Sequence, residues 1–277
     1  MLTKRLIDSM PEYKAYLLTK ELSEHTVRKY MSDIEHMLAY LNVTVLTHGD
    51  IVEYKTHLMS KYKSSTVNSY IISVNGFFKW LDRDELCVGL VKVQRRYFSS
   101  AQMSVKNYRV MLDYANRSGM DKKWYLIMRC LGGMGIRVGE LKFITVDAIY
   151  CGYAEINFKS KQRTILIPEE LRNMLIDHCA RENLNGGSVF LNKKHTAPID
   201  PSVIWRNLKR IADKVGIDSS TVYPHSFRRM FARTYMEVYG NIVDLADILG
   251  HSSIETTRIY TKQSKEVQRN KLDKLGL

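Results

Sequence analysis

The sequence predicts a mainly α-helical protein of two domains, with a small antiparallel β-sheet in the second domain. Three observations lead to this prediction. The chain has 277 residues, which is too long for one small domain and suits two. Apolar residues recur at steps of three and four through the first ninety residues, as in helices that bury one face. Further along, short strand-like segments surround a polar turn.

Four helices are expected in the first ninety residues. Their predicted starts, in chain order, are Ser9 with Pro11 and Glu12 at capping-box spacing, Ser23, Thr47 with Asp50, and a position near Ser65. The clearest apolar stripe, in the second helix, consists of Val27, Tyr30, Met31, Ile34, Met37, Leu38 and Leu41. Hydrophobic residues make up 45% of the chain, so the stripes are interpreted as core and disorder is excluded.

The second part of the chain has a mixed pattern. Helical periodicity surrounds residues 108–114 and 123–131, and strand-like segments are predicted at 146–150, 153–158 and 163–167. The last two segments flank the polar turn KSKQ and are expected to form a hairpin. Two more helices are predicted beyond it, one beginning at Pro168 and one at Pro201 with Asp200 as N-cap.

The charge balance points to a polyanionic partner. Lys and Arg number 42 against 29 for Asp and Glu, which gives a net charge of +13 and a pI near 9.5. Such an excess is typical of proteins that bind nucleic acid, although a basic surface that only aids solubility is the alternative. Candidate contacts to a DNA backbone are Lys92, Arg95, Arg96, Lys161, Arg206, Lys209 and Arg210. A solvated tether around Arg95 and a solvated helix face around Arg206 remain the alternatives.

Cysteine usage and the termini limit the class of protein further. The four cysteines form no CxxC pair, so neither a zinc site nor a disulfide framework is expected. No metal-ligand cluster or other cofactor motif is visible, and no cofactor is expected. The N-terminus lacks an apolar signal-peptide region and no apolar run is long enough to span a membrane. The expected location is the cytoplasm, in association with the nucleoid when DNA is bound.

Three segments carry residues suited to chemistry on an anion. They are GGMGIRVGEL with Arg137 and Glu140, YPHSFRRMF with His225 and Arg228, and LGHSSIETTRIY with His251 and Tyr260. An arginine in apolar surroundings needs an anion, and Glu140 at i+3 is a candidate. His225 and Arg228 share one helix face. Gly250 is expected to end a helix just before His251, and Ser252 with Glu255 to cap the next one.

The order of these residues resembles the tyrosine recombinase (phage integrase) family, and the compact Xer-type members most. The resemblance implies a helical, SAM-like core-binding domain over 1–90, a linker over 91–104, and a mixed α/β catalytic domain with a C-terminal tail over 105–277. It also implies roles for individual residues. Arg137, His225, Arg228 and His251 match catalytic residues, Glu140 a supporting acid and Tyr260 the nucleophile. A hairpin lysine is also expected, either Lys159 or Lys161, with Lys159 preferred.

The resemblance implies a site-specific recombinase of double-stranded DNA that acts through a 3′-phosphotyrosine. Integration, excision or resolution of DNA, including that of mobile elements, are the expected uses. Fixed guanidiniums suit this chemistry because they stabilise charge on a five-coordinate phosphorus without metal or ATP. A homotetramer on paired sites is implied, with an accessory or partner recombinase as an option. The C-terminal tail is expected to dock on a neighbouring protomer of that tetramer, and a frayed tail is the alternative. The alternatives are a type IB topoisomerase and a non-catalytic DNA-binding protein.

Overall fold

The computed structural model describes residues 3–41, 43–92, 103–119, 121–158, 161–251 and 253–260, together with Arg269 and Asp273. The chain divides into two compact units, Met1–Arg96 and Tyr97–Leu277, which are considered separately below. The predicted fold class, mainly helical with a small antiparallel sheet, is confirmed. The predicted domain limits stay a prediction, since most of the expected linker, 93–102, lies outside the described residues.

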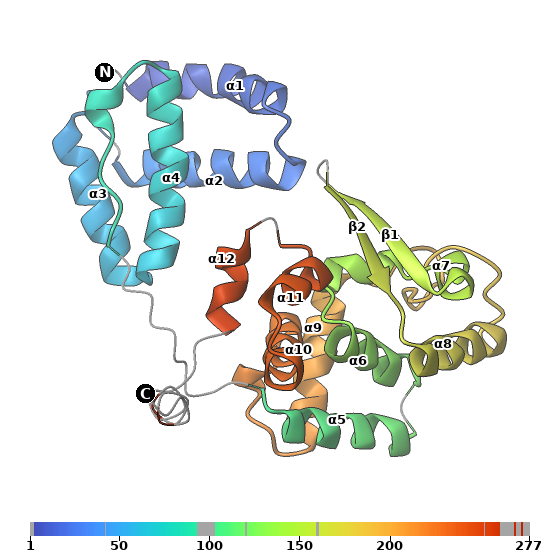
Figure 1. Ribbon diagram of the computed structural model, residues 1–277. Helices are drawn as coiled ribbons and strands as arrows, with labels where there is room; N and C mark the ends of the chain where they lie inside the picture. The colour runs from blue at the N-terminus through green and yellow to red at the C-terminus, as the bar shows by residue number, and fades with distance from the viewer. Residues whose placement is uncertain are drawn as a thin grey trace. The chain divides into compact units, whose positions relative to one another are not determined.

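The first unit is a bundle of four helices (Figure 1). Its elements are α1 (Thr3–Thr19), α2 (Glu24–Leu41), α3 (His48–Lys61), α4 (Ser64–Trp80) and the short 3₁₀ helix η1 (Asp84–Leu86). Helix α4 packs against both α2 and α3, and α1 packs against α2. The predicted caps are confirmed at Ser23, whose hydroxyl accepts from the Thr26 amide, and at Thr47, which forms a capping box with Asp50.

The predicted start of the first helix at Ser9 is wrong. Helix α1 already begins at Thr3, and Pro11 lies within it. An internal proline costs about 3 kcal/mol because it removes one hydrogen bond and crowds the preceding turn. Leu6 and Tyr13, on either side of the proline, are both essentially fully buried in the core of the bundle. Burial of these two side chains on one face offsets the cost and keeps the helix continuous.

The second unit packs helices around one large core that also takes in a β-hairpin. Its elements up to the middle of the unit are α5 (Val105–Arg117), α6 (Lys123–Gly133), η2 (Val138–Phe143), α7 (Val146–Cys151), β1 (Tyr153–Phe158) and β2 (Lys161–Leu166). They are followed by α8 (Glu169–Arg181), α9 (Pro201–Lys214), η3 (Ser219–Thr221), α10 (Pro224–Tyr239), α11 (Ile242–Leu249), α12 (Ile254–Thr257) and η4 (Arg258–Tyr260). Helix α10 contacts α6, α9 and α11, and so links the segments of the candidate site.

The hairpin prediction is confirmed, whereas the strand predicted at 146–150 is a helix. Strands β1 and β2 pair antiparallel, from Tyr153 opposite Leu166 to Phe158 opposite Lys161. The preceding segment forms α7 because Thr145 caps it by accepting from the Ala148 amide and Gly152 ends it with a φ of 84°. Val146 and Ile149 are buried at helical spacing, so β-branched composition alone suggested the wrong element.

No helix among the described residues is long and apolar enough to cross a membrane.

Candidate active site

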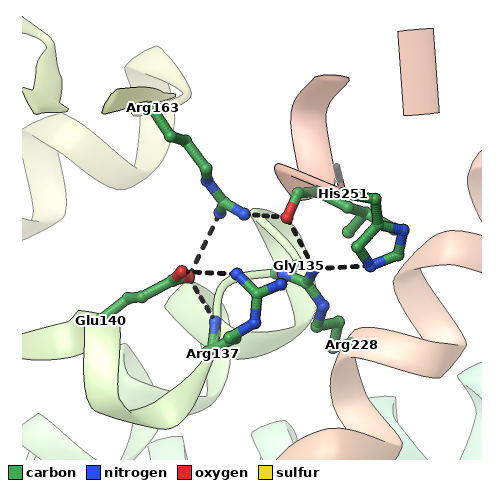
Figure 2. A network of polar contacts seen from close by, with 7 residues as sticks. Gly135, Arg137, Glu140, Arg163, Arg228 and His251 are labelled. Carbon is green, nitrogen blue, oxygen red and sulfur yellow. Dashed lines mark hydrogen bonds and ion pairs between the residues drawn. The ribbon is translucent and has the colours of Figure 1, made fainter. Parts of the chain in front are cut away.

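The site gathers on four segments of the second unit. Arg137 stands directly before η2, His225 and Arg228 lie in the first turns of α10, and His251 follows α11. Tyr260 ends the 3₁₀ helix η4. Figure 2 shows that the side chains of Arg137, Arg228 and His251 converge, together with Glu140 and Arg163, in one network of polar contacts.

Arg137 is held by the carboxylate that the sequence indicated. Its Nη1 donates to Glu140 Oε1 at 2.9 Å, and its backbone amide donates to Glu140 Oε2 at 2.7 Å. Glu140 is 8% exposed, whereas the Arg137 side chain is 40% exposed. The buried carboxylate therefore fixes one edge of the guanidinium and leaves the rest open to an incoming anion.

Arg228 is buried and aimed by two main-chain carbonyls. Its Nη1 donates to Gly135 O at 2.7 Å and its Nη2 donates to Leu249 O at 2.6 Å. Gly135 has a φ of 60°, and a Cβ there would lie 2.4 Å from Cδ1 of Phe231, so only glycine fits. Burial, followed by the charges of Arg137 and Arg163, lowers the pKa of Arg228 to about 10. The guanidinium thus remains charged at neutral pH while repelled by its neighbours.

His251 is neutral and its tautomer follows from its partners. Arginine has no acceptor, so Arg228 Nη2 donates to His251 Nε2 at 3.0 Å. The ring proton therefore sits on Nδ1 and is donated to Thr257 Oγ1 at 2.8 Å. Thr257 is fully buried in α12. Burial and the neighbouring arginines, first Arg228, lower the pKa of His251 to about 4, which agrees with this neutral form.

His225 is exposed near the start of α10 and is available as a base. Partial loss of solvation, followed by the charges of Arg228 and Arg137, lowers its pKa below the ordinary value. The imidazole is thus mainly unprotonated at neutral pH, the form in which it accepts a proton.

Tyr260 is half-buried against Ala232, Leu245 and Leu249. Burial raises the pKa of its hydroxyl, and nearby arginines, first Arg228, lower it, with burial the larger effect. The phenol is therefore neutral in the free protein, and its use as a nucleophile requires a base.

Arg163 is the charged member of this network that the sequence interpretation missed. Its side chain is 9% exposed, and its Nη2 donates to Glu140 Oε2 at 3.3 Å while its Nη1 donates to Leu249 O. A signal was present in the strand pattern. Arg163 stands two residues before the buried Ile165, so both side chains leave the same face of β2.

Several predicted residues lie away from this network or outside the described chain. Lys159, Arg95 and Arg96 are outside the described residues, as is Ser252, and Lys161 begins β2 with its side chain not described. The cap of α12 is Ser253, which accepts from the Glu255 amide, so the predicted pairing of Ser252 with Glu255 is wrong.

The basic residues predicted to meet DNA are accessible where they are described. Lys92, Arg206 and Arg210 are exposed. Lys209 is partly exposed and lies 4.4 Å from the ring centroid of Trp205, itself 43% exposed. Helix α9 thus carries cations and an aromatic ring on its open side, which suits contact with a nucleic-acid backbone.

Comparison with protein families matches both units. Residues 102–267 match the phage integrase family, and residues 10–85 match the N-terminal SAM-like domain of phage integrases. Tyrosine recombinase XerD of Listeria monocytogenes serovar 1/2a is 25% identical over 283 residues, which cover 93% of this chain and 95% of that protein.

Solved structures share the fold. A lambda integrase dimer bound to a COC′ core site has a TM-score of 0.76 at 18% identity, covering 96% of this chain and 97% of that chain. A lambda integrase tetramer bound to a Holliday junction has a TM-score of 0.72 at 18% identity, covering 90% of this chain and 77% of that chain.

Proposed function

The chain belongs to the phage integrase family, whose model matches more than half of its length, and from this premise we propose that Tyr260 is the residue with which it cuts DNA. The protein is a tyrosine recombinase, an enzyme that cleaves and rejoins DNA strands at specific sites. The observation that carries the assignment of the site is the excess of positive charge beside Tyr260. The charges of Arg228 and Arg137 both act on the Tyr260 hydroxyl, and of these two guanidiniums only that of Arg137 is paired with the carboxylate of Glu140. A phosphodiester supplies the missing negative charge.

The cleavage step follows from this arrangement. The Tyr260 oxygen attacks the phosphorus, the bond to the 5′-oxygen breaks, and the DNA 3′-phosphate becomes esterified to the tyrosine. His225 takes the phenolic proton, because its lowered pKa keeps it unprotonated at neutral pH. Arg137 and Arg228 bind the equatorial oxygens, where charge grows in the five-coordinate transition state. The neutral His251 keeps Arg228 oriented through their hydrogen bond.

The departing 5′-oxygen needs a proton, and the hairpin lysine Lys159 is assigned to supply it, with Lys161 as the alternative. Rejoining is the reverse reaction, in which a 5′-hydroxyl attacks the phosphotyrosine and releases Tyr260. The ester conserves the energy of the original bond, so the cycle requires no ATP.

DNA is held by both units through basic residues. The net charge of +13 and the exposed cations of α9, Arg206, Lys209 and Arg210, support this assignment. Lys92, Arg95 and Arg96, in the predicted linker, are assigned to the same role. The enzyme acts in the cytoplasm, on DNA of the nucleoid. The match to an N-terminal SAM-like domain and the recombinase relatives support recombination over the topoisomerase alternative.

Recombination requires two cleaved duplexes, so the active assembly is a homotetramer on paired sites. The fold shared with a lambda integrase tetramer bound to a Holliday junction supports this assembly. Val238, Tyr239 and Val243, at the end of α10 and the start of α11, are all more than half exposed. Apolar side chains grouped in this way favour an interface between protomers. A partner recombinase of a different sequence is a further option for the same assembly.

A nicked suicide substrate tests the nucleophile. Wild-type protein is expected to form a covalent DNA adduct that survives a denaturing gel, because the short strand diffuses away and blocks rejoining. Tyr260→Phe is expected to bind the same duplex with unchanged affinity and to form no adduct. Tyr150→Phe is the matched control, since Tyr150 lies on α7 of the same unit and is 60% exposed. An adduct from Tyr260→Phe would refute the assignment.

A further inference from the structure

Arg163 has no part in the reaction described above, yet it links the two arginines that do. We infer that Arg163 is a positioning residue that fixes the guanidiniums of Arg137 and Arg228 relative to each other. This inference rests on the proposed function, because it concerns the geometry of those two groups around a phosphate.

The link consists of two shared acceptors. Glu140 accepts from Arg137 Nη1 at 2.9 Å and from Arg163 Nη2 at 3.3 Å. The carbonyl of Leu249 accepts from Arg228 Nη2 at 2.6 Å and also from Arg163 Nη1. A continuous chain of polar contacts therefore runs from Arg137 through Glu140, Arg163 and Leu249 to Arg228 (Figure 2).

The position of Arg163 is costly for folding, which argues against a role in stability alone. Its Nε is buried without a hydrogen-bond partner among the described residues. Burial is the main effect and lowers the pKa of Arg163, the carboxylate of Glu140 offsets part of this effect, and the charge of Arg137 lowers the pKa further. Buried groups without partners and buried like charges destabilise a fold, so their presence favours a role other than stability.

The backbone of α11 is shaped around this side chain. Gly250 ends α11 with a φ of 61°, and a Cβ at that position would lie 2.3 Å from Cδ of Arg163. The absence of a Cβ thus lets the stem of Arg163 reach the Leu249 carbonyl from the opposite element, β2. The guanidinium braces the loop of Arg137 and the end of α11 at the same time.

A different role for Arg163 is to support the hairpin that carries the general acid. The two roles predict different responses to the leaving group. Guanidiniums that bind equatorial oxygens matter whichever atom departs, whereas a general acid is dispensable for a leaving group that needs no proton. Replacing the bridging 5′-oxygen of the substrate with sulfur creates such a leaving group, because a thiolate departs unprotonated.

The first measurement is the single-turnover rate of adduct formation on an ordinary nicked duplex. Arg163→Met is expected to lower this rate by about 10- to 100-fold, the usual loss when a group that orients a reacting residue is removed. DNA affinity is expected to stay within about twofold of wild type, because Arg163 is buried and donates inside the protein. The matched control is Arg129→Met, which removes an arginine that pairs with Glu170 elsewhere in the same unit.

The second measurement repeats the assay on the sulfur substrate. The deficit of Arg163→Met relative to wild type is expected to persist there. Disappearance of the deficit would overturn the inference and assign Arg163 to the hairpin. The double variant Arg137→Lys with Arg163→Met adds an independent check, since residues acting through one network give non-additive losses. Strict additivity would also overturn the inference.

Folding and function are separated by two further comparisons. Circular dichroism and thermal melting establish that each variant is folded. If Arg163→Met does not fold, Arg163→Lys keeps the charge without the forked donor geometry, and the same deficit in rate is expected from it. A wild-type rate in a folded Arg163 variant would refute this inference alone. Absence of an adduct from the wild-type protein would instead refute the proposed function.

Discussion

Each unit of the molecule buries a charged cluster, and the two clusters differ in their balance. In the first unit, the carboxylate of Asp33 is 7% exposed and pairs with Lys29, and Ser73 donates to it at 2.6 Å. One negative charge meets one positive charge. In the second unit, Glu140 pairs with Arg137 and Arg163, while the buried Arg228 nearby donates to main-chain carbonyls, so positive charge is in excess. A balanced cluster is complete within its own fold, whereas an unbalanced one is completed by an anion from outside.

The difference also separates stability from catalysis. Removal of a group from a complete cluster leaves its partners unsatisfied and weakens the fold. Removal of a cation from the unbalanced cluster relieves repulsion and instead weakens the binding of a transition state that carries extra negative charge. Substitutions in the two clusters are therefore expected to move different observables, and the following measurements examine that expectation from the largest effect to the smallest.

The largest effect is expected from Arg137→Lys. The variant keeps the charge but loses the planar fork, so the rate of cleavage is expected to fall by about 100-fold or more. Thermal stability is expected to change little, because the Arg137 side chain is 40% exposed. Single-turnover assays and melting curves provide the two readouts, with Arg129→Lys as control. Equal cleavage rates for Arg137→Lys and wild type would show that Arg137 has a structural role. The two clusters would then no longer differ in what they contribute.

Asp33→Asn is expected to show the opposite behaviour. The free energy of unfolding of the first unit is expected to fall by about 1 to 3 kcal/mol, since the hydrogen bond from Ser73 loses its charged acceptor. The cleavage rate per folded molecule is expected to be unchanged. Urea unfolding gives the first quantity, and Glu35→Gln, an exposed carboxylate on the same helix, is the control. A catalytic defect with unaltered stability would contradict this interpretation.

A smaller effect is expected from Thr257→Val, which keeps the shape of the side chain but removes the acceptor of the His251 Nδ1 proton. Loss of one ordinary hydrogen bond, about 1.4 kcal/mol, corresponds to about a tenfold lower cleavage rate if it acts on the orientation of His251. Thr257→Ser keeps the hydroxyl and is expected to restore most of the rate. If the Ser and Val variants are equally slow, packing rather than the hydrogen bond is responsible.

A separate test of the same cluster concerns pH. The pKa of His251 is lowered from 6.5 to about 4 in the folded state, so between these values the unfolded chain binds more protons. The free energy of unfolding is therefore expected to fall as pH decreases through this window. His225 shifts in the same direction. Melting temperatures measured from pH 4 to 7.5 should decline less steeply for His251→Gln than for wild type, and parallel profiles would contradict the assignment.

Local patterns were sufficient to predict contacts between residues that are close in the chain. The pair of Arg137 and Glu140, three residues apart, followed from spacing alone. The capping of α3 by Thr47 and the end of α11 at Gly250 depend on single residues with strong conformational preferences. Patterns failed where tertiary burial decided the outcome, as in α1, which continues through Pro11, and in α7, whose composition resembles that of a strand.

Arg163 illustrates the limit of such patterns at the site itself. Its partners are 23 and 86 residues away along the chain, and no spacing rule connects such distant positions. The strand pattern held a signal in its alternation with the buried Ile165, but no prediction was drawn from it, and only the fold shows which groups Arg163 meets. The roles of His225 and Tyr260 differ again, since they follow from the family resemblance, and the chain alone would have favoured an ordinary surface histidine and a core tyrosine.

Two of the groups that aim Arg228 belong to the main chain, the carbonyl oxygens of Gly135 and Leu249. An alanine scan leaves such oxygens in place. It will therefore report only the packing of the fully buried Leu249 side chain and will not detect the hydrogen bonds that the Leu249 carbonyl accepts. Replacing the amide that contains the Leu249 carbonyl with an ester, by expressed protein ligation, weakens that acceptor and removes the Gly250 N–H that donates to Asp247 O, while every side chain stays in place. The Leu249 carbonyl, which accepts from both Arg163 and Arg228, can thus be altered by chemical synthesis but not by side-chain mutagenesis.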